Sequence, residues 1–109
     1  MSTYAILGCG SVGYAVAEDL AADSKDVLIL DKDESRVESL RDQDLNAQRT
    51  DISEPDVVDA VGDRDVVLIL ASDVDANKAA VSALRDRGSD QFVVARASDP
   101  VTEDELGEL

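Results

Sequence analysis

Near its start the chain reads Tyr4-Ala5-Ile6-Leu7-Gly8-Cys9-Gly10-Ser11-Val12-Gly13, an apolar run that leads into glycines spaced G-x-G-x-x-G. A helical pattern and a second apolar run, Val27–Leu30, follow, and that run ends on Asp31. Such a unit suits a dinucleotide, because the glycines allow a tight turn, a close approach of the pyrophosphate and close packing of the helix. The glycine spacing alone is weak support. With the strand, the helix and the acid around it, the stretch predicts a Rossmann-like nucleotide-binding fold.

The residues predicted to hold the nucleotide lie in the turn, at the start of the helix and at the tip of the second strand. The turn and the helix N-terminus, whose free N–H groups and partial positive charge suit phosphates, comprise Gly8, Gly10, Ser11, Val12 and Gly13. Asp31 is expected to accept hydrogen bonds from the hydroxyls of the adenosine ribose. Its charge would repel a ribose 2′-phosphate, which favours NAD or NADH over NADP, although Arg36 offsets part of this repulsion.

Strand and helix signals alternate from one end of the chain to the other. Apolar runs predict strands over 3–8, 26–31, 66–70 and 91–95, with a short strand near 47–49. Helical periodicity predicts helices over 11–22, 33–41 and 74–86, and one more that ends at Gly62. This order predicts a three-layer α/β fold, in which a parallel sheet of strand order 3-2-1-4-5 carries helices on both faces. The nucleotide crevice is then expected between the first and fourth strands.

Finer predictions concern the helices. Ser53 is expected to cap the third helix, with Pro55 in its first turn. The residues expected on the buried face of the first helix are Val12, Ala15, Val16 and Leu20, and those of the helix at 74–86 are Ala76, Ala79, Ala80, Ala83 and Leu84. Thr102–Leu109 begins like a further helix with a capping box. We therefore expect residues 1–109 to be one dinucleotide-binding domain, truncated near its C-terminus and part of a longer chain.

Acidic residues dominate the composition: 25 Asp and Glu against 10 Lys and Arg give a net charge of −15 over 109 residues. Strong and regularly spaced apolar runs argue against disorder, and such a surface is typical of halophilic proteins, in which high salt screens the carboxylates. The charge would repel nucleic acids and anionic membranes, and no run of the sequence suits a signal peptide or a membrane span. We expect a cytoplasmic protein with no nucleic-acid partner and no direct membrane insertion.

Groups suited to catalysis or metal binding are sparse. The chain has no histidine, and no lysine follows Tyr4 or Tyr14 at the spacing of a Tyr-x-x-x-Lys hydride-transfer site. Cys9 has no second cysteine to pair with and is expected to fill a gap in packing. The acid clusters at 63–65 and 73–75 are interpreted as solvated surface. We expect no catalytic residue and no metal, which leaves two classes: a non-catalytic NAD-sensing domain, and the cofactor-binding half of a dehydrogenase.

Over essentially its whole length the chain resembles TrkA-N domains, the N-terminal part of RCK domains. The resemblance rests on Ile6–Gly13, on Leu30-Asp31-Lys32-Asp33 with Arg36-Val37 behind it, on Thr50-Asp51, and on Asp65–Leu70 followed by Asn77. Members of this family bind NAD(H), sometimes other adenine nucleotides such as ATP or ADP, and gate potassium transport. The resemblance therefore implies an NAD(H)-binding regulatory domain that forms homodimers or higher oligomers and acts on a membrane potassium transporter.

The resemblance also implies site residues beyond the glycine turn. It adds Lys32 to the nucleotide-binding residues, places Asp51 and Ile52 beside the adenine, and has Ala71 and Ser72 line the crevice above the fourth strand. Arg49-Thr50 departs from the family pattern, which has a small residue and a glycine before the Asp. The same domain type begins DHH-family phosphoesterases, to which Val93–Pro100 is similar. The alternative function is a nucleotide-sensing domain of such an enzyme.

The acidic surface predicts a fold whose stability depends on salt. Repulsion among the carboxylates weakens as the Debye length falls from about 10 Å at 0.1 M to about 3 Å at 1 M ionic strength. We expect the melting temperature, followed by circular dichroism, to rise between dilute buffer and molar KCl. A melting temperature that stays the same or falls would contradict the halophilic interpretation.

Overall fold

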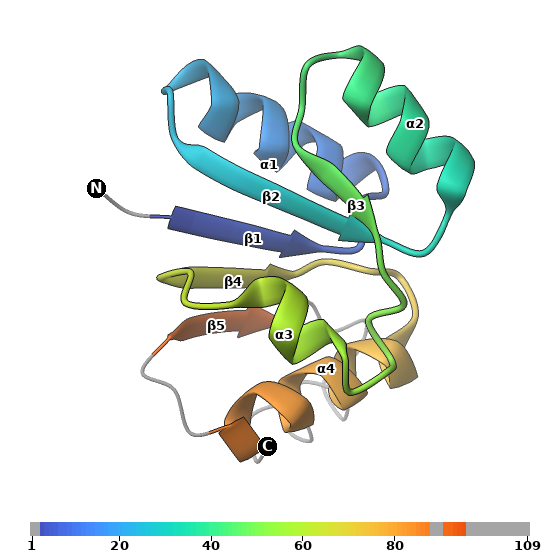
Figure 1. Ribbon diagram of the computed structural model, residues 1–109, viewed down its shortest axis with the longest axis vertical. Helices are drawn as coiled ribbons and strands as arrows, with labels where there is room; N and C mark the ends of the chain where they lie inside the picture. Colours follow the sequence, from blue (N-terminus) through green and yellow to red (C-terminus); the bar gives the residue numbers. More distant parts are fainter. Residues whose placement is uncertain (1–2, 88–90, 96–109) are drawn as a thin grey trace.

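The computed structural model describes residues 3–87 and 91–95, which form a parallel sheet with helices on both faces (Figure 1). In chain order the elements are β1 (Thr3–Leu7), α1 (Ser11–Ala22), β2 (Asp26–Asp31), α2 (Glu34–Asp42), β3 (Ala47–Arg49), α3 (Val57–Val61), β4 (Val66–Ile69), α4 (Val74–Arg87) and β5 (Phe92–Ala95). All pairings are parallel, and the strand order is β3-β2-β1-β4-β5. The predicted fold class and strand order are confirmed.

The strand β1 lies at the centre of the sheet and pairs with β2 on one side and β4 on the other. Its last residue, Leu7, pairs with Leu30 of β2 and with Ile69 of β4. The three strands thus end at the same level. Because the carboxyl ends of parallel strands share one edge, the glycine turn, Asp31 and the loop after β4 meet there.

Two apolar cores lie on opposite faces of the sheet, because successive strand residues point to opposite sides. Ile6 and Ile29 pack with residues of α1 and α2, including the buried Val37. Leu7 and Leu30 pack on the other face with residues of α3 and α4. Figure 1 shows α1 and α2 together on one side of the sheet and α3 and α4 on the other. This covering on both faces explains why β1 and β2 read as continuous apolar runs.

The helix α1 turns a different face to the sheet from the predicted one. Its buried residues are Gly13 and Ala17, whereas Val12 is 44% exposed. The predicted face is therefore wrong at Val12 and Ala15, which are exposed, and only partly right at Val16 and Leu20, which are half-buried. The cause is a close approach: a Cβ on Gly13 would lie 2.7 Å from the carbonyl oxygen of Gly8. The helix α1 therefore packs against the sheet through its small residues Gly13 and Ala17, and close packing at the third glycine of the motif is what the motif predicts.

The helix α3 begins later than predicted, at Val57 instead of near Ser53. The backbone N–H and the hydroxyl of Ser53 both donate to Oδ1 of Asp51, at 3.0 Å and 2.6 Å. Ser53 therefore closes a turn on Asp51 and does not cap the helix. Hydrogen bonds between residues three apart continue through 51–59, a tighter winding than an α-helix. Gly62 follows the helix as predicted, with a φ of 62°.

The remaining predictions agree with the structure at most boundaries. The strands at 3–8 and 66–70 end one residue earlier, at Leu7 and Ile69. The buried residues of α4 are Asn77, Ala80, Val81 and Leu84. Ala80 and Leu84 are thereby confirmed, Ala76, Ala79 and Ala83 are half-buried, and the polar Asn77 was not predicted to be buried. The helix predicted over Thr102–Leu109 lies outside the described residues.

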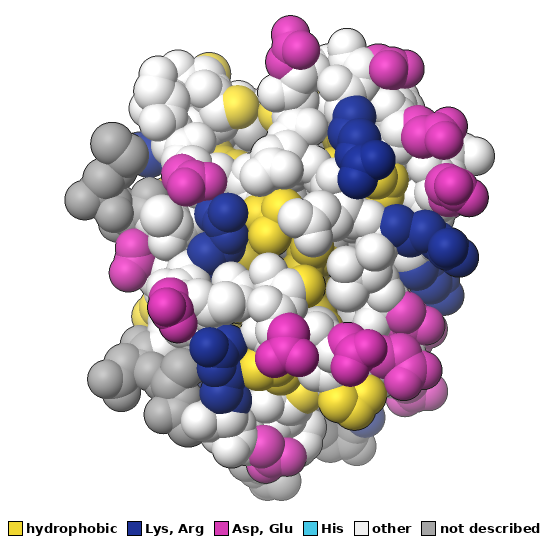
Figure 2. Space-filling view, in the orientation of Figure 1, with side chains coloured by type: hydrophobic (Ala, Val, Ile, Leu, Met, Phe, Trp, Pro, Cys, Tyr) yellow, Lys and Arg dark blue, Asp and Glu magenta, His cyan; other side chains and the backbone are white. Residues whose placement is uncertain are grey.

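Charged side chains cover much of the visible surface. In Figure 2, Asp and Glu side chains lie mainly around the margin, with Lys and Arg between them and apolar atoms nearer the middle. Among the described residues, no helix is long and apolar enough to cross a bilayer.

The glycine turn gives a matched pair of stability predictions. We expect Gly13→Ala to lower the free energy of unfolding by about 1–3 kcal/mol, because its Cβ would press on the Gly8 carbonyl, which is held in the turn. Gly10→Ala is the control: a Cβ there meets nothing within 4 Å, and the backbone is extended with a φ of −82°. It should change the unfolding free energy by no more than about 1 kcal/mol. Urea titrations that rank the two variants the other way would contradict the packing described for α1.

Candidate nucleotide-binding crevice

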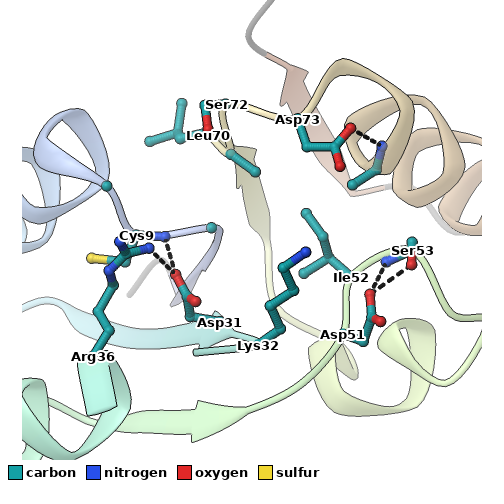
Figure 3. A pocket seen from close by; sticks show the side chains of 14 residues that line it. Cys9, Asp31, Lys32, Arg36, Asp51, Ile52, Ser53, Leu70, Ser72 and Asp73 are labelled. Atoms are coloured by element: carbon teal, nitrogen blue, oxygen red, sulfur yellow. Dashed lines mark hydrogen bonds and ion pairs between the residues drawn. The ribbon is translucent and has the colours of Figure 1, made fainter. Parts of the chain in front are cut away.

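The carboxyl ends of β1, β2 and β4 open into a crevice of about 250 Å³ (Figure 3). Four connections surround it: the turn after β1, the loop after β2, the loop after β3 and the loop after β4. The lining residues are Gly8, Cys9, Gly10, Asp31, Lys32, Arg36, Asp51, Ile52, Ser53, Leu70, Ala71, Ser72, Asp73 and Ala76. A crevice at this edge, between β1 and β4, is where open parallel sheets bind ligands.

The glycine turn brings bare backbone to the crevice. Gly8 has a φ of 87°, a conformation that L side chains rarely adopt, and its N–H donates to the Leu30 carbonyl at 2.7 Å. A Cβ on Gly8 would lie 2.5 Å from the Cβ of Ala71, so no other residue fits. Gly10 has open space where its Cβ would be, and no side chain caps the helix α1 that it precedes. The first N–H groups of α1 thus retain their capacity to bind an anion.

Asp31, at the tip of β2, is 5% exposed and accepts three hydrogen bonds. Its Oδ2 accepts from the backbone N–H of Cys9 at 2.8 Å and from the guanidinium of Arg36 at 3.1 Å. Its Oδ1 accepts from the N–H of Asp33 at 2.9 Å. Figure 3 shows the bonds from Cys9 and Arg36 converging on this carboxylate at the crevice wall. The acid therefore joins the glycine turn, the tip of β2 and α2.

Two opposing effects set the pKa of Asp31. Burial by itself would raise the pKa, because it penalises the charged form. The backbone N–H groups of Asp33 and Cys9 and the Arg36 side chain stabilise the carboxylate more strongly, so the net pKa lies below its ordinary value. Asp31 is therefore an anionic acceptor throughout the neutral range.

The loop after β3 forms a second acidic wall. Asp51 accepts the two hydrogen bonds from Ser53, and these bonds hold the pKa of its carboxyl below the ordinary value. The neighbouring Ile52 is 6% exposed, belongs to the core and also lines the crevice. Figure 3 shows Lys32 projecting into the crevice between Asp31 and Asp51. The wall thus combines an acceptor, an apolar surface and a cation.

The loop after β4 forms the opposite wall. The N–H of Leu70 donates to the Leu7 carbonyl at 2.8 Å, which continues the β1–β4 ladder past the end of β4. Asp73 accepts from the N–H groups of Asp75 and Ala76 at 3.0 and 3.2 Å, and so it starts α4. Ala71 and Ser72 lie between these anchors and line the crevice.

Comparison with known proteins assigns this arrangement to a family. The family model of the TrkA-N domain matches residues 4–109. The chain belongs to the TrkA-N domain family. The Trk system potassium uptake protein TrkA of Vibrio alginolyticus is 36% identical over 67 residues, which are 61% of this chain and 15% of that protein. The chain thus spans only a small part of this relative's length.

Solved structures support the same TrkA-N fold. The NAD(P)-binding domain of an exopolyphosphatase-related protein from Archaeoglobus fulgidus is 28% identical, with a TM-score of 0.89 over 99% of this chain and 82% of that one. The GsuK channel bound to NAD has a TM-score of 0.87 over 98% of this chain and 20% of that one. The latter is 13% identical, and its similarity therefore shows the fold alone.

The TrkA-N crevice brings together most of the predicted site residues. Those that line it are Gly8, Gly10, Asp31, Lys32, Asp51, Ile52, Ala71 and Ser72. Ser11 instead lines a neighbouring cavity between α1 and α2. Val12 lines neither cavity, and Gly13 is buried under the turn. Gly13 thus serves packing, and a contribution of Val12 to binding stays a prediction.

Some lining residues were not among the predicted binding residues. Arg36 had a sequence signal, since its positive charge five positions after Asp31 was expected to offset part of that acid's repulsion. Ser53 and Asp73 had no comparable signal. Cys9 is 3% exposed and packs in the core, as predicted, and burial raises the pKa of its thiol. Its backbone N–H, which binds Asp31, is what it contributes to the wall. In the part of the chain that the structure describes, no three His, Cys, Asp or Glu residues lie close enough together to hold a metal ion.

The hydrogen bonds of Asp31 predict a specific pH dependence. A carboxyl whose pKa is lower in the folded than in the unfolded state stabilises the fold above its unfolded pKa of about 3.9, and this contribution disappears as the pH falls through the folded pKa. In molar KCl, Asp31→Asn should lower the unfolding free energy by an amount that is constant above about pH 5 and shrinks on acidification. A difference between wild type and variant that stays constant or grows down to pH 3 would contradict the hydrogen-bonded, ionised Asp31.

Proposed function

We propose that this TrkA-N domain is a non-catalytic, cytoplasmic regulatory domain that binds NAD or NADH and controls potassium transport. The observation that carries the proposal is the buried carboxylate of Asp31, held at the crevice beside a glycine turn with an uncapped helix N-terminus. A pyrophosphate suits the turn, and the adenosine ribose suits the acid. The proposed output follows from the relative that is a Trk potassium uptake protein.

The charges of the crevice support a dinucleotide over ATP or ADP. Its lining contains the carboxylates of Asp31, Asp51 and Asp73 against the cations of Lys32 and Arg36. NAD and NADH carry fewer negative charges than ATP, ADP or NADPH, and they therefore meet less repulsion from these acids. A solved relative of the fold that holds NAD agrees with this choice. We propose NAD(H) as the ligand and the adenylates as the alternative.

Regulation of a membrane transporter by a small domain calls for an assembly. We propose that the domain acts as a homodimer or higher oligomer, and that its output depends on the nucleotide held in the crevice. The NAD(P)-binding domain of the exopolyphosphatase-related protein supports a nucleotide as the ligand and favours no particular output. The role in a DHH-family phosphoesterase stays a hypothesis. A dehydrogenase would need a substrate-binding region that the short connections around this crevice do not supply.

Calorimetry in molar KCl tests the proposal, with NAD, NADH, NADPH, ATP and ADP titrated in parallel. We expect micromolar binding of NAD or NADH and weaker binding of the more highly charged ligands. Asp31→Ala should weaken NAD binding by about 1–3 kcal/mol, because charge-assisted hydrogen bonds are lost. Gly10→Val should abolish binding while the domain stays folded, since its side chain would fill open space at the phosphate turn.

Asp42→Ala is the matched control for charge, because it removes an exposed acid of α2 that does not line the crevice. It should bind NAD as the wild type does. Stronger binding of ATP or ADP than of NAD(H) would move the function to adenylate sensing. Unchanged titrations of Asp31→Ala and Gly10→Val would contradict the site itself.

A further inference from the structure

The helix α4 buries a polar side chain close to the crevice. Asn77 is 1% exposed and lies in the first turns of the helix, among otherwise apolar buried residues. An amide taken out of water costs free energy unless hydrogen bonds replace the lost water, and asparagine is a poor residue for a helix interior. A buried Asn at this position therefore calls for a specific partner.

One such partner is the backbone of the crevice wall. Nδ2 of Asn77 donates to the carbonyl oxygen of Ala71 at 2.7 Å. Ala71 lies beyond the end of β4, past the last pairs that the described strands form, so its carbonyl needs a partner outside that ladder. Asn77 does not itself line the crevice, whereas Ala71 and Ser72 do. The amide thus contacts the wall from behind.

The other side of Ala71 is held by the glycine turn. A Cβ on Gly8 would lie 2.5 Å from the Cβ of Ala71 and 2.7 Å from its backbone nitrogen, so the two backbones are in direct contact. The preceding residue, Leu70, is tied to Leu7 by its N–H. Ala71 is therefore held between the glycine turn on one side and the Asn77 amide on the other.

We propose that Asn77 is a positioning residue for nucleotide binding: its amide sets the place of the Ala71–Ser72 wall against the glycine turn. The inference rests on the proposed nucleotide-binding function and adds a residue that acts through Ala71. Binding groups act well only when a second layer of hydrogen bonds holds them in place. Without the amide, the Ala71 carbonyl loses this hydrogen bond, and the distance between the Ala71–Ser72 wall and the glycine turn is no longer fixed from the side of α4.

The test compares Asn77→Leu with Leu84→Ala in the full chain, in molar KCl. Leucine matches asparagine closely in size and removes the side-chain amide, including its hydrogen bond to the Ala71 carbonyl, whereas Leu84 is a buried residue of the same helix that lies away from the crevice. Urea titrations give the stability of each variant, and calorimetry gives its affinity for NADH. We expect Asn77→Leu to weaken NADH binding about tenfold. Leu84→Ala should lose more stability and bind NADH within about twofold of wild type.

A second readout needs no ligand. The ¹⁵N chemical shift of the Ser72 amide reports on the peptide unit whose carbonyl Asn77 holds. In Asn77→Leu the shifts of Ala71 and Ser72 should move and their amide hydrogens should exchange faster, while those of β2 stay unchanged. Asn77→Ala, which favours helix formation, serves as the second variant if the leucine variant does not fold.

The outcomes separate this inference from the proposed function. The positioning role is overturned if both Asn77 variants bind NADH with wild-type affinity. It is also overturned if their loss of NADH affinity is no larger than that of Leu84→Ala. If the wild type binds none of the nucleotides, the proposed function fails, and the amide shifts then decide the positioning role. Unchanged Ala71 and Ser72 resonances overturn it, and changes confined to that loop support it.

Discussion

The crevice depends on an approach between backbones that only glycine permits. At Gly8 the turn after β1 touches the backbone of Ala71, and its carbonyl lies under α1 so closely that a Cβ on Gly13 would be 2.7 Å away. One turn thereby joins the central strand, the first helix and the loop after β4 so closely that neither Gly8 nor Gly13 has room for a side chain. The helix start stays uncapped at the crevice, where its N–H groups can serve a ligand.

Asp31 ties the remaining wall to that turn. A carboxylate that is 5% exposed stays ionised because two backbone N–H groups and a guanidinium replace its water. One of those donors is the N–H of Cys9, inside the glycine motif, and another is Arg36 of α2. The residue proposed to bind the ribose is therefore also a structural link between β1, β2 and α2. If a substitution of Asp31 weakens nucleotide binding, the stability of the variant must be measured as well, because the substitution also removes this structural link.

Much of the fold could be predicted from the sequence because its strands are apolar and buried on both faces. The strand order and the acid at the tip of β2 follow from that pattern and from the glycine spacing. Predictions failed where close contacts override periodicity: apolar period places Val12 inward, whereas the approach at Gly13 turns it to solvent. Ser53 failed as a helix cap because it closes a turn on Asp51, and the α-helix begins only at Val57.

The role of Asn77 lay outside sequence reasoning for a different reason. The family resemblance includes Asn77 but assigns it no role, and a polar residue inside a helical pattern is read as exposed. Its partner is a backbone carbonyl, which no side-chain pattern indicates. Ala71 and Ser72, in turn, were placed at the crevice by family resemblance alone. Side-chain patterns predict which face of an element is buried, but they do not predict where a loop backbone will be held.

An anionic ligand on a chain of net charge −15 poses an electrostatic problem that the crevice solves locally. At the molar salt that we predict for this protein, the Debye length is about 3 Å, so the field of distant carboxylates hardly reaches the proposed ligand. Attraction from distant cations is screened as well. In the proposed function, binding then comes from groups in contact with the ligand: the N–H groups at the start of α1, the Asp31 carboxylate, and Lys32 and Arg36 in the lining. Because contact interactions depend steeply on distance, the placement of the walls at Gly8 and, as proposed, at Asn77 would then matter more for binding than overall charge.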